Sequence, residues 1–208
     1  MATLALSLGI GSATAIYSVV HAVLLKPLGY PDAERMVVVW HSFTTRPGWR
    51  AAFSWLDSLD FAARSRTTEA FGCLTGGSFN VTYNRQATRV EGAHVTPALV
   101  HAMGIQPELG RWFQDEAKEP GGVYTAVISD SLWKRFGGNP DILGKPLTMN
   151  GRQYTILGVM PPGYSQPPWD GKQIWVPLNP DPDQRKYRGY NYLSCLAMLS
   201  KISDYLLR

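Results

Sequence analysis

The stretch that decides the class of this protein is residues 2–25, which read ATLALSLGIGSATAIYSVVHAVLL. It contains no Asp, Glu, Lys or Arg. An α-helix rises ~1.5 Å per residue, so a helix of this length reaches about 36 Å and exceeds the ~30 Å hydrocarbon core of a bilayer. Lys26 and Pro27 end the run, and a proline interrupts helical hydrogen bonding. The pattern therefore predicts a transmembrane helix over residues 2–25.

Two other interpretations of this stretch fit less well. A cleaved signal peptide has a basic start and an apolar run of only ~7–15 residues, and a buried core helix usually carries a polar face. Small residues recur every fourth position at Ser7, Gly11 and Ala15, which favours close packing against neighbouring membrane helices. The basic residues Lys26 and Arg35 follow the helix, and the positive-inside rule taken alone would place them in the cytoplasm.

Composition and charge leave two interpretations of a basic segment open. The net charge is +4, and the densest basic group is Arg185, Lys186 and Arg188, with Tyr187 and Tyr190 between and after them. Such a stripe could hold phosphates or lipid headgroups. Two aspartates come just before it and no nucleic-acid-binding module is present, so a solvated loop is favoured and nucleic acid is not expected as a partner.

The remaining sequence predicts an α+β fold with mixed sheets. β-branched and aromatic runs indicate strands, Ser or Thr caps indicate helix starts, and Asn150-Gly151 is a strong hairpin signal. The predicted strands are 36–40, 71–74, 79–83, 88–95, 123–128, 146–150, 153–159, 174–178 and 192–199, and the predicted helices are 54–64, 96–103 and 131–136.

No constellation of residues predicts catalysis, a cofactor or a metal. His94 and His101 fall in a strand and a helix, so their spacing is no metal signature. Asp115, Glu116 and Glu119 lack the glycine-centred loop of a calcium site and fit a solvated acidic turn. We therefore expect no catalytic, cofactor-binding or metal residues and no enzyme activity.

The two cysteines, Cys73 and Cys195, have no metal-binding spacing. They could form one disulfide in an oxidising compartment. Two unpaired core cysteines are the default expectation, and the sequence leaves the choice open.

Several blocks, in a fixed order, carry a family resemblance. They are residues 9–35, 53–57, 89–99, 103–113, 127–140 and 147–164, and together they resemble a MacB-like ABC transporter permease. More narrowly, they are similar to the duplicated orphan permeases abundant in acidobacteria. The likeness extends to about Pro180.

The resemblance implies an extracytoplasmic domain of two lobes beside the first membrane helix of a bacterial inner-membrane protein. Residues 30–104 and 190–200 would form a membrane-proximal α+β lobe, and residues 105–180 a strand-rich lobe inserted into it. This location opposes the positive-inside hint, and we follow the resemblance.

The same resemblance implies a mechanical role in which membrane-helix motion is coupled to substrates or partners outside the membrane. The implied partners are the lipid bilayer, other permease helices or a second permease half, and a separate ATP-hydrolysing subunit. The residues after Leu199 depart from the family pattern, so we expect a truncated fragment. The alternative is a membrane-anchored binding or interaction module without transport activity.

Overall fold

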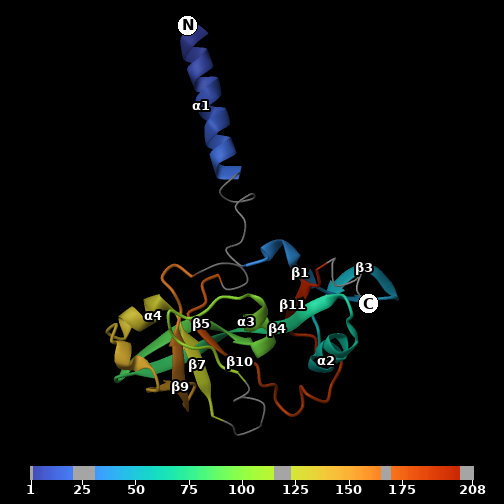
Figure 1. Cartoon of the computed structure of the whole chain (residues 1–208), viewed down its shortest axis with the longest axis vertical. Helices are drawn as coiled ribbons and strands as arrows, with labels where there is room; N and C mark the ends of the chain where they lie inside the picture. Colours follow the sequence, from blue (N-terminus) through green and yellow to red (C-terminus); the bar gives the residue numbers. More distant parts are fainter. Residues whose placement is uncertain (1, 21–30, 115–122, 165–169, 202–208) are drawn as a thin grey trace.

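The computed structural model describes residues 2–20, 31–114, 123–164 and 170–201 (Figure 1). The first element, α1, is a helix over Ala2–Val20. Among the described residues no helix combines the length and the apolar character needed to cross a membrane. Residues 21–25 of the predicted span lie outside the described ranges, so the transmembrane helix over 2–25 stays a prediction.

The described part of the domain is built on one nine-stranded sheet with the order β1-β11-β4-β5-β10-β7-β9-β6, in which β8 pairs with β4 and β9. In chain order its strands are β1 (Met36–Val39), β4 (Thr68–Tyr83), β5 (Gln86–Val95), β6 (Leu109–Gly110), β7 (Thr125–Ile128), β8 (Pro146–Met149), β9 (Arg152–Val159), β10 (Ile174–Pro177) and β11 (Ser194–Leu199). β10 runs parallel to β5 and β7 runs parallel to β9, whereas the other pairs are antiparallel. The expected α+β class with a mixed sheet is confirmed.

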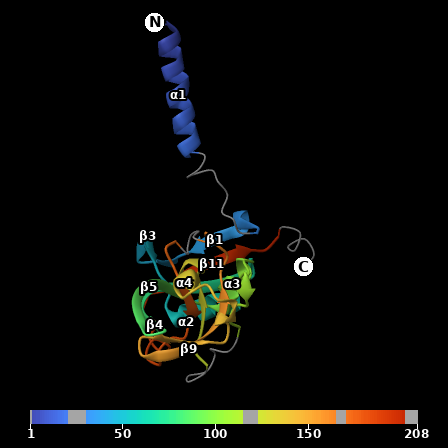
Figure 2. The ribbon, with the colours of Figure 1, turned by 90° about the vertical axis from the view of Figure 1, so that its left-hand side faces the viewer.

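Short helices cover the sheet (Figures 1 and 2). They are α2 (Trp55–Arg64), α3 (Pro97–Ala102) and α4 (Asp130–Arg135), with single 3₁₀ turns η2 (Ala33–Arg35) and η3 (Pro140–Ile142). Side chains alternate between the faces of a strand, so neighbouring residues of β4 meet different helices. Gly72 lies against Leu99 of α3, whereas the Phe71 ring packs 4.6 Å from the ring of Phe61 in α2. α2 and α3 therefore lie on opposite faces of β4.

Tight turns explain two of the hairpins. Asn150 and Gly151 both have positive φ, at 49° and 79°, and they join Met149 to its partner Arg152. Two central residues with positive φ match the right-handed twist of the strands they connect. Asn84 and Arg85 make the corresponding turn between β4 and β5. The predicted Asn150-Gly151 hairpin is confirmed.

Three details differ from the sequence prediction. The predicted strands 71–74 and 79–83 are one continuous strand, β4, because β5 pairs with it from Leu74 to Tyr83 across the Gly76-Gly77 pair. A hairpin of β2 (His41–Phe43) and β3 (Arg46–Ala51), and the two-residue strand β6, were not predicted. β2 and β3 are short and largely exposed, so they lack the alternating apolar pattern that would mark them.

The main sheet passes through both residue ranges of the predicted lobes. β5 belongs to the range 30–104 and pairs with β10 from the range 105–180, and β4 likewise pairs with β8. The described core residues pack in three clusters. The first centres on Leu99, Phe113 and Trp175, the second on Ile128, Leu147 and Ile156, and the third on Phe53, Cys73 and Cys195. The division into two lobes stays a prediction.

Candidate functional site

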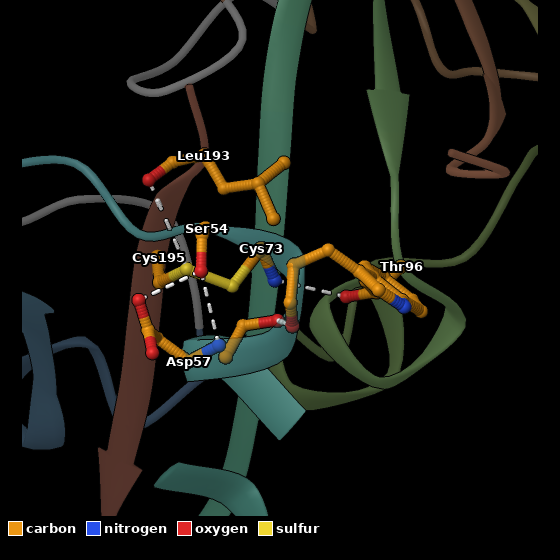
Figure 3. The surroundings of a disulfide bond; sticks show 8 residues. Ser54, Asp57, Cys73, Thr96, Leu193 and Cys195 are labelled. Atoms are coloured by element: carbon orange, nitrogen blue, oxygen red, sulfur yellow. Dashed lines mark hydrogen bonds between the residues drawn. A yellow bond between two sulfur atoms is a disulfide. The ribbon is translucent and has the colours of Figure 1, made fainter. Parts of the chain in front are cut away.

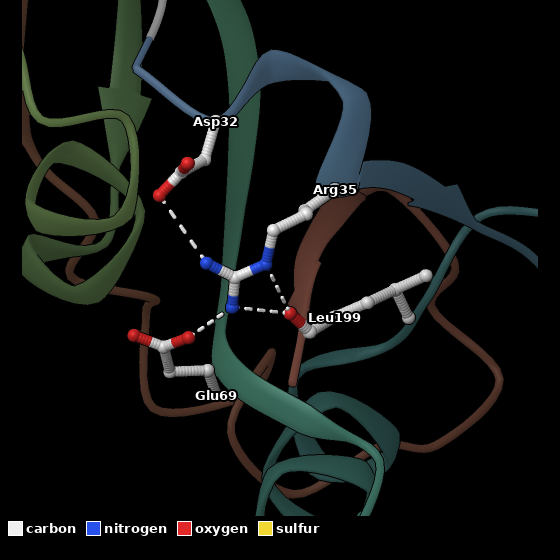
Figure 4. Close-up of polar contacts among 4 residues, drawn as sticks. All are labelled: Asp32, Arg35, Glu69 and Leu199. Carbon is white, nitrogen blue, oxygen red and sulfur yellow. Dashed lines mark hydrogen bonds and ion pairs between the residues drawn. The ribbon is translucent and has the colours of Figure 1, made fainter. Parts of the chain in front are cut away.

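The chain enters and leaves the described domain at one place. β1 and β11 are antiparallel neighbours, with Met36 opposite Met198. Arg35 joins the two strands directly, because its Nε donates a hydrogen bond of 2.9 Å to the carbonyl oxygen of Leu199 (Figure 4). The first and last strands of the domain are thus held side by side.

Two carboxylates complete the surroundings of this arginine. The guanidinium pairs with Asp32 at 3.2 Å and with the carboxylate of Glu69 at the start of β4 (Figure 4). The hydrogen bond that the guanidinium donates to Glu69 is the main cause that raises the pKa of Arg35. The charged guanidinium therefore ties together η2, β4 and β11 at the junction.

A disulfide lies next to this junction, between β4 and β11. Cys73 and Cys195 face each other in register, with a Cα–Cα distance of 4.0 Å, and their sulfurs are bonded (Figure 3). Both residues are almost fully buried. The default expectation of two unpaired core cysteines was wrong. The sequence did not indicate the pairing, because the two cysteines are 122 residues apart and meet only when β11 lies beside β4.

The caps of two helices converge on the disulfide (Figure 3). The Thr96 hydroxyl accepts a hydrogen bond of 2.9 Å from the backbone N–H of Cys73, and Thr96 N–H donates back to the Cys73 carbonyl at 2.9 Å. On the other side the Ser54 hydroxyl caps α2 by accepting from Asp57 N–H at 3.2 Å. Phe53, which comes just before this cap, forms a β-bridge with Leu193 just before β11. The start of α3 is thus hydrogen-bonded to β4, and the start of α2 to the residue that precedes β11.

A second candidate site lies elsewhere, beneath the segment 178–192. It is a cavity of about 700 Å³, within the ~300–1,000 Å³ typical of ligand sites. Its walls come from β4, β5, β7, β9, β10 and that segment. Its lining includes Thr75, His94, Tyr124, Thr125, Arg152, Tyr154, Asp181, Arg185, Lys186, Tyr190 and Tyr192.

The basic segment noted in the sequence divides its side chains between two places. Arg185 and Lys186 line the cavity. Arg188 instead reaches α2 and pairs with Asp57 at 2.7 Å and Asp60 at 2.8 Å. The favoured reading of a solvated loop describes Tyr187, which is 66% exposed, but the segment is also anchored to α2 through Arg188.

The two histidines singled out in the sequence lie on separate elements, β5 and α3. Burial lowers the pKa of His94 below its ordinary value, opposed in part by a hydrogen bond with the carbonyl of Pro177. Among the described residues no group of His, Cys, Asp or Glu side chains could hold a metal ion. Asp115, Glu116 and Glu119 lie outside the described ranges.

The pKa of a tyrosine in the cavity wall, Tyr192, is raised, whereas that of His94 is lowered. Burial raises the pKa of Tyr192 to about 12, so its phenol is neutral at physiological pH. Its hydroxyl and that of Thr125 are buried and have no hydrogen-bond partner within the described part of the chain. Sequence patterns gave no signal for this cavity, because its walls come from segments scattered between residues 75 and 192.

Comparison with known proteins gives a consistent result. The family model described as "MacB-like periplasmic core domain" matches residues 1–200. No curated protein matches the chain.

Solved structures share the fold at low sequence identity. The extracellular domain of the noncanonic ABC-type transporter YknZ from Gram-positive bacteria is 14% identical, with a TM-score of 0.58 over 83% of this chain and 87% of that one. The periplasmic region of MacB from Actinobacillus actinomycetemcomitans is 15% identical, with a TM-score of 0.56 over 80% of this chain and 75% of that one.

Proposed function

The chain belongs to the family of MacB-like periplasmic core domains of ABC-type transporter permeases, and from this premise we propose that it couples the motion of membrane helices to substrates or partner proteins outside the membrane. In this proposal residues 2–25 form a single membrane span in the bacterial inner membrane, and the described domain is extracytoplasmic. ATP is hydrolysed by a separate subunit, and this chain has no catalytic activity of its own.

The observation that carries the proposal is the pairing of the first and last strands through Arg35 and Leu199. The span proposed over residues 2–25 precedes β1 in the chain, so its motion would reach the domain at this junction. Hydrogen bonds and ion pairs of one guanidinium connect the junction to β4 and β11. Movement of either connection would therefore be transmitted to the main sheet.

The disulfide supports the proposed location. Disulfides persist in oxidising compartments such as the periplasm and the cell exterior, and they are rare in the cytosol. The bonded pair Cys73–Cys195 thus favours an extracytoplasmic domain over the cytoplasmic position suggested by Lys26 and Arg35. The absence of charge from residues 2–25 supports the membrane span.

The location is tested by labelling one new thiol in intact spheroplasts. Ala87→Cys places the thiol on an exposed residue near the β4–β5 turn, and the two native cysteines are bonded and so do not react. A membrane-impermeant maleimide should label this variant in intact spheroplasts as fully as in lysed ones. Labelling only after lysis would refute the extracytoplasmic location.

The coupling role is tested by hydrogen exchange in membranes that hold the chain with an ATP-hydrolysing partner. Addition of ATP should change deuterium uptake in residues 35–39 and 194–199, and Arg35→Gln should reduce that change. No effect of ATP on either segment would refute the coupling.

The cavity beneath residues 178–192 supports a second candidate function, a membrane-anchored binding module without transport activity.

A further inference from the structure

The cavity beneath the segment 178–192 has apolar walls made of two tyrosine pairs. Tyr124 and Tyr154 have ring centroids 5.1 Å apart, and Tyr190 and Tyr192 have centroids 5.0 Å apart. The first pair lies beside the starts of β7 and β9, and the second precedes β11. In the order of the sheet, the strands β4, β5 and β10 lie between β11 and β7. Aromatic faces offer large apolar area to a planar ligand.

The polar part of the lining is mainly cationic. Arg152, Arg185 and Lys186 contribute positive charge, and Asp181 is the carboxylate among the lining residues. The Arg152 guanidinium donates a hydrogen bond to the Tyr124 hydroxyl at 3.0 Å and lies 5.4 Å from that ring centroid. Three positive groups against one negative group favour an anion.

The cationic groups keep unused donors. An arginine has five N–H donors, and in Arg185 the Nε donates to the Pro180 carbonyl at 2.9 Å while one terminal nitrogen donates to Asn179. Lys186 has no ion-pair partner among the residues that the structure describes. These groups can therefore donate to a ligand without breaking an internal ion pair, and charge-assisted hydrogen bonds are about twice as strong as neutral ones.

The uncharged groups of the wall add no negative charge that would repel an anion. Burial favours the neutral forms of His94 and Tyr192. The segment 178–192 is also held in place without a ligand, by the ion pairs of Arg188 with α2. A site formed before binding avoids part of the entropic cost of ordering its wall.

We propose that this cavity is a binding site for organic anions that combine a carboxylate or sulfonate group with a planar apolar body. The tyrosine pairs take the apolar body, and Arg152, Arg185 and Lys186 receive the acidic group. The proposal rests on the cavity alone and requires neither a membrane span nor an ATP-hydrolysing partner.

The test compares two probes of nearly equal shape on the purified full chain in a nonionic detergent. They are 1-naphthaleneacetate, which is an anion, and 1-naphthaleneacetamide, which is neutral. Isothermal titration, corrected by titration into empty micelles, should give at least tenfold tighter binding of the anion. Equal binding of the two probes, or no binding of the anion at millimolar concentration, would overturn the proposal.

Charge variants identify the groups that receive the acid. Lys186→Gln and Arg152→Gln should each weaken anion binding about five- to tenfold and leave amide binding unchanged. Lys145→Gln is the matched control, because Lys145 is an exposed lysine outside the cavity lining. An equal effect of Lys145→Gln would show that only the overall positive charge acts and would overturn the site.

Steric variants identify the cavity itself. Thr75 lines the cavity and is paired with His94, another lining residue, whereas a Cβ at the adjacent Gly76 would point to the opposite face of β4, toward Lys172. Thr75→Trp should abolish binding of both probes, whereas Gly76→Ala should leave it unchanged. Full binding by a folded Thr75→Trp variant would overturn the proposal. None of these outcomes affects the maleimide-labelling test or the hydrogen-exchange test with ATP. Failure of the cavity proposal is therefore distinct from failure of the proposed function.

Discussion

Removal of the Cys73–Cys195 disulfide should lower the stability of the domain by an amount that the structure bounds. The bond closes a loop with a sequence separation of 122 residues. In the chain-entropy model such a closure restricts the unfolded state by about 16 cal/mol/K, or about 5 kcal/mol at 25 °C. Measured losses for native disulfides are typically 2–5 kcal/mol, so we expect the double variant Cys73→Ala, Cys195→Ala to fall in that range.

The measurement is thermal unfolding of the full chain in a mild detergent, followed by tryptophan fluorescence. For a domain of this size 1 kcal/mol corresponds to about 2–4 °C, so the midpoint should fall by about 4–20 °C. Dithiothreitol should lower the wild-type midpoint by a similar amount and leave the double variant unchanged, which controls for lost packing of the sulfur atoms. If neither the reductant nor the double substitution moves the midpoint, the bond does not constrain the unfolded chain and the reasoning is refuted.

Two further predictions concern packing and pH. Gly72→Ala should destabilise the domain by about 1–3 kcal/mol, because its added Cβ would lie 2.5 Å from the backbone nitrogen of Leu99, whereas Gly77→Ala on the same strand meets nothing within 4 Å. Equal unfolding midpoints for the two variants would contradict this account of α3 packing. Burial lowers the pKa of His94 in the folded state, so the stability it contributes is present above the ordinary value of 6.5 and is lost as pH falls through the lowered folded value. The midpoint of wild type should therefore drop more between pH 7.5 and 5 than that of His94→Gln, and parallel pH profiles would refute this.

Local signals in the sequence predicted the elements whose structure depends on a few neighbouring residues. The Asn150-Gly151 turn forms because both residues take positive φ readily. α2 begins after Ser54 because that side chain caps the helix, as the sequence predicted. The α+β class and the family followed from several such segments in a fixed order.

The arrangement of distant segments required the tertiary structure. Cys73 and Cys195 pair because β11 lies beside β4, and no local signal specifies that neighbour. β4 continues through Gly76-Gly77 because β5 supplies its hydrogen bonds, although glycine weakens a strand on its own. The cavity likewise depends on sheet order, which brings Arg152 of β9 and Lys186 of the later segment into the lining of one cavity. Short-range propensity acts over a few residues, whereas strand order follows from burying the whole core, so the sequence alone determined the elements and the tertiary structure decided the site.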